Sequence, residues 1–151
     1  TVAQARDVFE ARRLIEPALV RQVTQRATPE QIAELRAHLA REEQAQTSAD
    51  QRKIIDLSGQ FHLLLADMSG NSFLARSMRE LETLSALLIV LFGTPTHEAC
   101  PSDHPALVDA IEKRDPARAA ELMLHHLAHV ERSVQLETSP EVARSLEDIF
   151  A

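Results

Sequence analysis

The sequence has no tryptophan, no tyrosine, only 3 glycines and a single cysteine among its 151 residues. β-Branched and aromatic residues, which are enriched in strands, are sparse, whereas leucine, alanine, glutamate, arginine and glutamine dominate. This composition favours an all-α fold. One cysteine cannot form an internal disulfide, which fits a reducing cytoplasm, and we expect that localisation.

Long apolar runs are also missing. None approaches the roughly 18 residues that a membrane span needs, and the start of the chain lacks the apolar segment and cleavage site of a signal peptide, so no membrane partner is expected. The longest run, LSALLIVLF at residues 84–92, is predicted to be a buried core helix. The formal net charge of −7 repels phosphate backbones, which makes this chain alone a poor binder of nucleic acid.

Prolines, glycines and capping residues divide the chain into about seven predicted helices. Pro17 is expected to kink or split the first of them, because an interior proline removes a hydrogen bond and clashes with the preceding turn. Helices joined by short loops predict an antiparallel bundle of six to seven helices with a polar site in its core. The expected helices cover about residues 3–26, 29–46, 49–68, 72–92, 103–114 and 116–136, with a short seventh from Ser139 and Pro140.

Histidines recur on the apolar faces of these helices. Because successive helical residues turn by about 100°, His62, His104 and His126 each fall on the apolar face of a different helix. In the stretch LMLHHLAHVE, by contrast, His125 and His129 lie farther round and are expected to be wetter. The three inward histidines are either unrelated core residues with separate polar partners or ligands that converge on one metal ion. The residues alone leave both alternatives open.

Other candidate ligands carry weaker signals. His125 and His129 have the i,i+4 spacing that can bind a metal from one helix face, but exposed pairs of this kind also arise by chance. Cys100, in the predicted loop, is interpreted as a buried thiol in preference to a thiolate ligand. His38 is expected at the surface, and His97 in the same loop as the cysteine.

Three stretches of the sequence together resemble a known family: EARRLIEPALV, SGQFHLLLADMSGNSFL and DHPALVDAIEKRDPARAAELMLHHLAHV. They are similar to the C-terminal ligand-binding domain, called FCD, of GntR-family transcription regulators of the FadR subfamily, over about residues 7–136. The resemblance implies an antiparallel helical bundle around a central polar cavity. It also implies a single effector-binding and dimerisation domain over residues 1–151, with the winged helix-turn-helix of such regulators absent from this chain.

The resemblance further implies a metal site, since many members hold a divalent ion by an aspartate and three histidines. By position the histidines are His62, His104 and His126, where we expect zinc, with nickel or manganese as alternatives. The family aspartate lies four residues before the first histidine, and that position is Ser58 here. A site of three neutral imidazoles therefore keeps open positions for water or an anion, or it lacks the metal and remains a polar pocket.

The same resemblance suggests residues for a small carboxylate effector. The family commonly has an arginine at the position of Arg12, and such a side chain can clamp a carboxylate with two hydrogen bonds. An ordinary ion pair with Glu16, or a solvated face, is the favoured interpretation of this arginine. Arg13, Ser58 and Cys100 complete the candidate effector-binding set.

The predicted function is therefore that of a sensor and not an enzyme. An acid entering the cavity would change helix packing in a homodimer, and DNA would be contacted only through the missing N-terminal domain. A metal-dependent hydrolase is the first alternative, but no residue stands at a compelling general-base spacing and no nucleophile motif is present. A purely structural dimerisation module is the second.

Overall fold

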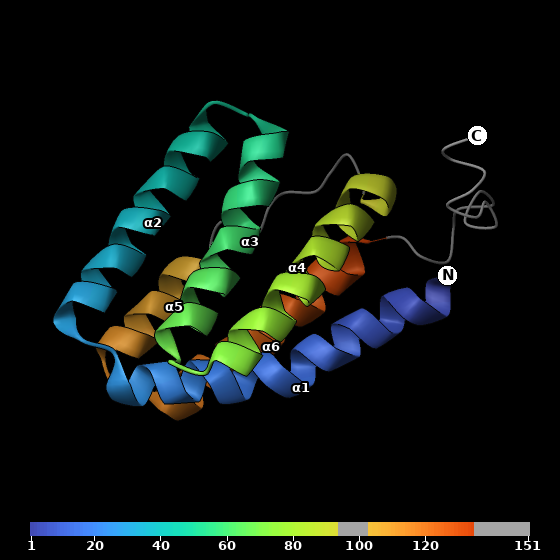
Figure 1. The fold of residues 1–151 in the computed structure, drawn as a ribbon. Coiled ribbons are helices and arrows are strands. Elements are labelled where there is room, and N and C mark those ends of the chain that lie inside the picture. Colours follow the sequence, from blue (N-terminus) through green and yellow to red (C-terminus); the bar gives the residue numbers. More distant parts are fainter. Residues whose placement is uncertain (94–102, 135–151) are drawn as a thin grey trace.

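The computed structural model describes residues 1–93 and 103–134, and within these ranges the chain folds into six helices without a sheet (Figure 1). The all-α prediction is confirmed, and the only strand-like feature described is an isolated bridge between Gly93 and Val134. The predicted seventh helix lies outside the described residues. The helices are α1 (Val2–Arg26), α2 (Pro29–Thr47), α3 (Gln51–Met68), α4 (Ser72–Phe92), α5 (Asp103–Glu112) and α6 (Pro116–Ser133).

Side-chain caps explain where most of these helices begin. Thr28 accepts from the backbone N–H of Gln31, whose side chain in turn accepts from the backbone N–H of Thr28, so the predicted capping box is present at α2. Asp50, Asn71 and Asp115 cap α3, α4 and α6 in the same manner with a side-chain oxygen. The sequence therefore predicts the starts of these helices closely, because a cap is a local interaction.

Pro17 does not split the first helix, which runs unbroken from Val2 to Arg26. Its ring is buried, and α1 packs against α3, α4, α5 and α6. These contacts hold the helix together although the proline removes one backbone hydrogen bond. Of the kink or split expected at Pro17, the split does not occur, and the long α1 provides a common surface for α3, α4, α5 and α6.

The bundle places its largest apolar side chains between the helices. In Figure 1, α2, α3 and α4 form a row, α1 crosses below them, and α5 and α6 lie behind. Neighbouring pairs in the packing include α1 with α6, α2 with α3, α3 with α4 and α5 with α6. The fully buried core side chains include Leu19, Leu35, Phe61, Leu107, Met123 and Leu127.

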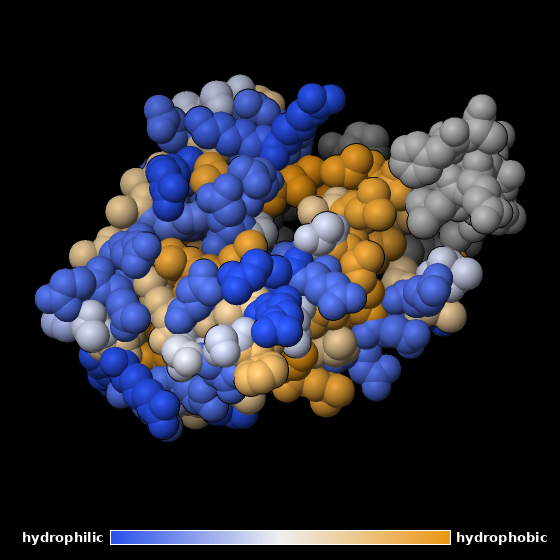
Figure 2. All heavy atoms as spheres, viewed as in Figure 1, coloured by the Kyte–Doolittle hydropathy of each residue, from blue (hydrophilic) through white to orange (hydrophobic). Residues whose placement is uncertain are grey.

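The second half of α4 is less buried than its sequence predicts. Leu84, Leu87, Val90 and Leu91 expose 40% to 67% of their surface, and Figure 2 shows an apolar patch over this helix. Within the described residues its main packing partners are α3 and α1, and Leu88, Ile89 and Phe92 also pack against a small apolar cluster that includes Val130 of α6. One side of its second half is nevertheless left exposed at the surface of the bundle. No helix within the described ranges combines the length and apolarity needed to cross a membrane.

Candidate metal centre

Three helices bring His62, His104 and His126 together in the interior. The histidines come from α3, α5 and α6, and all three side chains are buried. The Nε2 atom of His126 lies 3.2 Å from that of His62 and 3.2 Å from that of His104. Each ring offers a nitrogen that lies within 4.8 Å of the other two, and we call these residues the histidine triad. The face analysis thus selected the three histidines that converge.

Apolar packing fixes the orientation of the rings. Phe61, the neighbour of His62 on α3, stacks on the ring of His104 with centroids 4.0 Å apart and an angle of 17° between the planes. The rings of His62 and His126 also stack, at 5.1 Å and 24°. On α6, Met123 and Leu127 are fully buried on either side of His126 in the sequence. The triad is therefore part of the core and is not a surface cluster.

A carboxylate lies behind each ring of the triad. In every case an Nδ1 atom faces the carboxylate, which leaves Nε2 to face the other two rings. A carboxylate in this position holds the proton on Nδ1 and makes the free Nε2 atom a better metal ligand. The sequence analysis did not assign this role to any carboxylate, although Glu42 shares the buried face of α2 and Asp103 directly precedes a triad residue. The pairs are His62–Glu16 at 2.5 Å, His104–Glu42 at 2.9 Å and His126–Asp103 at 3.4 Å.

Burial favours the neutral form of His104 and His126, whereas the pKa values of the carboxylates behind the rings are lowered. Burial lowers the pKa of His126 to about 3 and outweighs the opposing effect of Asp103. Burial also lowers the pKa of His104, although Glu42 opposes the change. Burial alone would raise the pKa of Glu42, but hydrogen bonds from His104 and His38 bring it down to about 2. A neutral imidazole with a charged carboxylate behind it is the form that binds metal ions.

The triad fits a cation because its three Nε2 atoms cannot satisfy one another. With Nδ1 protonated, each Nε2 atom carries a lone pair and no hydrogen. If His126 instead held a proton on Nε2, it would donate well to only one of its two neighbours, and facing lone pairs would remain. Two nitrogen ligands at about 2.05 Å from one tetrahedral ion lie about 3.3 Å apart, close to the observed 3.2 Å.

A charged cluster lies on the opposite side of His62, formed by Arg12, Glu16 and Glu82. All three side chains are buried, so the suggestion of a solvated face for Arg12 is wrong, and the alternative ion pair with Glu16 is present at 2.6 Å. The Nη2 atom of Arg12 also lies 2.5 Å from Glu82. Burial raises the pKa of Glu82, whereas Arg12 and His62 together overcome burial at Glu16 and hold the pKa of that carboxyl well below its usual range.

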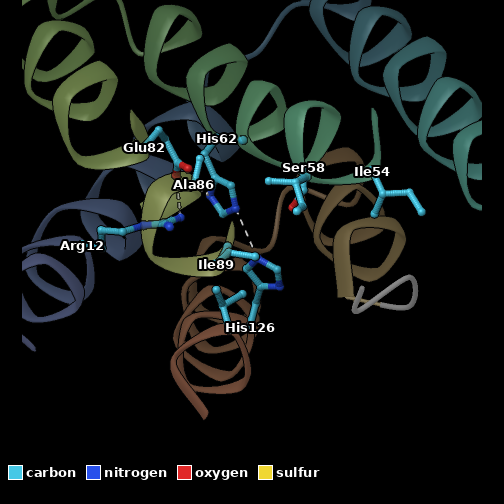
Figure 3. Close-up of a pocket in the computed structure, with 11 residues that line it drawn as sticks. Arg12, Ile54, Ser58, His62, Glu82, Ala86, Ile89 and His126 are labelled. Carbon is cyan, nitrogen blue, oxygen red and sulfur yellow. Dashed lines mark hydrogen bonds and ion pairs between the residues drawn. The ribbon is translucent and has the colours of Figure 1, made fainter. Parts of the chain in front are cut away.

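A small cavity of about 40 Å³ is lined by members of both the triad and the charged cluster (Figure 3). Arg12, Ser58, His62, Glu82 and His126 provide its polar lining, and Figure 3 shows Ala86 and Ile89 of α4 across the same space. A volume of this size accommodates a few water molecules or a very small ligand. Two members of the candidate effector-binding set, Arg12 and Ser58, thus reach the cavity.

Arg13, another member of the candidate set, does not line this cavity. Arg13 is half-buried and forms an ion pair with Glu131 on α6. Cys100 and His97 lie outside the described residues. His125 and His129 point outward, as predicted, and their side chains are 66% and 46% exposed.

His38 is buried, and its predicted surface position is wrong. Its Nε2 atom lies 2.9 Å from the carbonyl oxygen of Leu57, which can only accept, so this nitrogen carries the proton. The other ring nitrogen then accepts a hydrogen bond from Arg41 at 3.0 Å. His38 shares the inner face of α2 with Leu35 and Glu42, and its position on this helical face, three residues after Leu35, explains its burial.

Comparison with known proteins identifies the family. The model of the FCD domain matches residues 7–129. The chain belongs to the FCD family. The HTH-type transcriptional repressor NanR of Salmonella newport (strain SL254) is 35% identical to this FCD domain over 127 residues, which cover 81% of this chain and 48% of NanR. The chain therefore spans about half the length of the curated relatives it matches.

Solved structures agree with this assignment of the FCD domain. GntR of Streptococcus agalactiae superposes with a TM-score of 0.75 at 28% identity, over 85% of this chain and 58% of that protein. McbR/YncC of E. coli shares the fold, with a TM-score of 0.72 at 20% identity over 86% of this chain and 65% of that one. The resemblance found in the sequence is confirmed, and so is the assignment to a family of regulator domains instead of enzymes.

Proposed function

We propose that this FCD domain senses a small organic acid for a bacterial transcription regulator, with a divalent metal ion held by the histidine triad. The observation that carries the proposal is the convergence of three buried imidazole rings. Their Nε2 atoms lie close together, and each ring has a carboxylate at its Nδ1 atom. Unrelated core histidines would have no reason to direct their unprotonated nitrogens at one another. The family supplies the second support, because NanR is a transcriptional repressor.

His62, His104 and His126 are the proposed metal ligands, with zinc as the expected ion and nickel or manganese as alternatives. Three imidazoles suit zinc and nickel better than the hard ions calcium and magnesium, which prefer oxygen. Ser58 stands where many family members have an aspartate, so the protein provides three neutral ligands and leaves coordination positions to water or an anion. A bound ion would supply positive charge to a cavity whose charged lining is otherwise the carboxylate of Glu82 and the guanidinium of Arg12.

The proposed effector is a small carboxylate that enters the cavity beside Arg12 and Ser58. Pockets for small molecules usually measure about 300–1,000 Å³, whereas this cavity measures about 40 Å³. An effector of ordinary size would therefore have to separate the helices that line the cavity. An effector that binds only when these helices are separated shifts the bundle from the closed to the separated helix packing. Such a shift can transmit effector binding to other parts of the protein.

Assembly and DNA binding complete the proposal. A homodimer in the cytoplasm suits regulators that read paired half-sites in DNA. The net charge of −7 on this chain opposes direct contact with DNA. We therefore assign DNA contact to an N-terminal winged helix-turn-helix domain and the sensing step to this domain.

Elemental analysis and calorimetric zinc titration of the purified chain test the proposal. We expect one tightly bound ion per chain, and we expect its loss in each of the three variants His62→Ala, His104→Ala and His126→Ala. His125→Ala and His129→Ala serve as controls on the same helix, and they should retain the tight site. Two remaining imidazoles rarely hold zinc tightly.

Two outcomes contradict the proposal. Retention of the tight ion by His126→Ala, with its loss from His125→Ala, would show that the assigned ligands on α6 are wrong. A wild-type chain that binds no zinc at all would leave a helical dimerisation module as the better description.

A further inference from the structure

The outward histidines of α6 face a carboxylate that also touches the triad. His125 and His129 are four residues apart on one face of the helix, and Asp103 is the first residue of α5. The Oδ1 atom of Asp103 lies 3.9 Å from Nδ1 of His125, and its Oδ2 atom lies 3.7 Å from Nδ1 of His129. One carboxylate thus stands opposite both exposed rings.

We infer that His125, His129 and Asp103 form a second, solvent-accessible site for a divalent transition-metal ion, which we call the outer site. Two imidazoles four residues apart on a helix can bind one ion from the same side. A carboxylate completes the set of two histidines and one acid that occupies one face of many transition-metal sites. The remaining coordination positions would face solvent.

The two outward rings must rotate for an ion to bind at the outer site, because the three residues do not already hold their ligand atoms within 4.8 Å of one another. Two ligand atoms on one ion at about 2.1 Å lie about 3.0–3.4 Å apart, so the observed nitrogen–oxygen distances of 3.7 and 3.9 Å must also shorten by about half an ångström. The rings can make this adjustment, since their side chains are 66% and 46% exposed. Asp103 is the fixed element, because only 15% of its side chain is exposed and its Oδ2 atom also lies 3.4 Å from Nδ1 of His126.

Asp103 therefore connects the outer site to the triad. Its Oδ1 atom faces His125, while its Oδ2 atom faces both His126 and His129. A carboxylate can bridge in this way, with one oxygen on an ion and the other on an imidazole N–H. Removal of the carboxylate should weaken both sites, whereas removal of either outward ring should affect the outer site alone.

Calorimetric titration of the full chain with zinc chloride tests the inference. We expect a second, weaker binding event in the wild-type chain after the tight one. His125→Ala and His129→Ala should each weaken the second event by at least about tenfold and leave the tight event unchanged. Asp103→Asn should weaken both events. Asp109→Asn is the matched control, because it removes an exposed carboxylate from the same helix that pairs with Arg36 and not with a histidine.

The outcomes separate this inference from the proposed function. A second event that persists unchanged in a His125→Ala/His129→Ala double variant would overturn the outer site, and so would its absence from the wild-type chain. Neither result alters the tight event, which depends on the triad. Loss of the tight event alone, with the weaker one retained in His126→Ala, would confirm that the two sites are distinct.

Discussion

The two sides of His62 present opposite electrostatic situations. On its Nδ1 side, Arg12 provides a buried positive charge between two carboxylates, Glu16 and Glu82. On its Nε2 side, the ring meets His126, and His104 completes a group of three facing imidazoles. Both regions are buried and polar, yet the first contains its own cation and the second contains none.

This difference in charge indicates which of the two buried polar clusters could take a ligand from outside the protein. The charged cluster is held by ion pairs within the protein, so its stability depends on keeping its arginine. With each Nδ1 proton directed at a carboxylate, the triad presents three lone pairs without a donor, and a cation held there would satisfy them. Burial of polar residues alone would not distinguish the two, whereas the hydrogen-bonding capacity of the facing atoms does.

The largest effect is expected when the charged cluster loses its cation. Arg12→Met should lower the free energy of unfolding by about 3–5 kcal/mol, because it leaves two carboxylates buried without a positive partner. Arg13→Met is the matched control, and it should cost less than about 1 kcal/mol because that ion pair is only half-buried. Urea denaturation of both variants measures the difference, and equal losses would show that burial of the ion pair does not matter.

A smaller effect distinguishes the carboxylates on the two sides. Glu42→Gln should weaken zinc binding by about 10–100-fold, because the carboxylate behind His104 becomes neutral. Glu82→Gln has the same chemistry but lies on the other side of His62, and we expect it to change zinc affinity much less. Competition with a chelating indicator dye measures both affinities. A greater loss in the Glu82 variant would place the metal on the side of the charged cluster.

The smallest expected effect is the pH dependence of the free energy of unfolding of the metal-free chain. The folded state holds the pKa of His104 and His126 below that of a free imidazole, so the unfolded chain binds more protons below about pH 6.5. The free energy of unfolding should therefore fall as pH decreases from about 6.5, by up to about 1.4 kcal/mol per pH unit for each proton taken up.

Urea denaturation with a chelator present, at several values between pH 7 and pH 5, measures this slope. The lowered pKa of Glu42 acts in the same direction only below its usual value of about 4.5, so this range isolates the histidines. His126→Gln should reduce the slope by the contribution of one proton. A flat profile in the wild-type chain would mean that the triad rings bind protons equally well in the folded and unfolded states.

Periodicity and capping residues predicted the helices and the inward direction of three histidines, since both follow from the sequence of a single helix. The partners of these histidines could not be predicted in the same way. Glu16 and Glu42 reach the triad from α1 and α2, and helical periodicity shows which face of a helix is buried but not what lies opposite. The exposed half of α4 has the same explanation, because an apolar run does not reveal whether one or two neighbours cover it.

The pairing of rings and carboxylates across helices also constrains how this sequence can diverge. Glu42 on α2 and His104 on α5 are buried together, so loss of the ring alone would leave a charge without a partner in the core. In relatives that have replaced this histidine by an apolar residue, the glutamate should be neutral or apolar as well. Part of the Asp103 side chain is exposed to solvent, so this aspartate can remain in relatives that have lost the histidine at position 126. Covariation among FCD sequences should therefore be strong for the deeply buried pairs and weak for the pair nearest the surface.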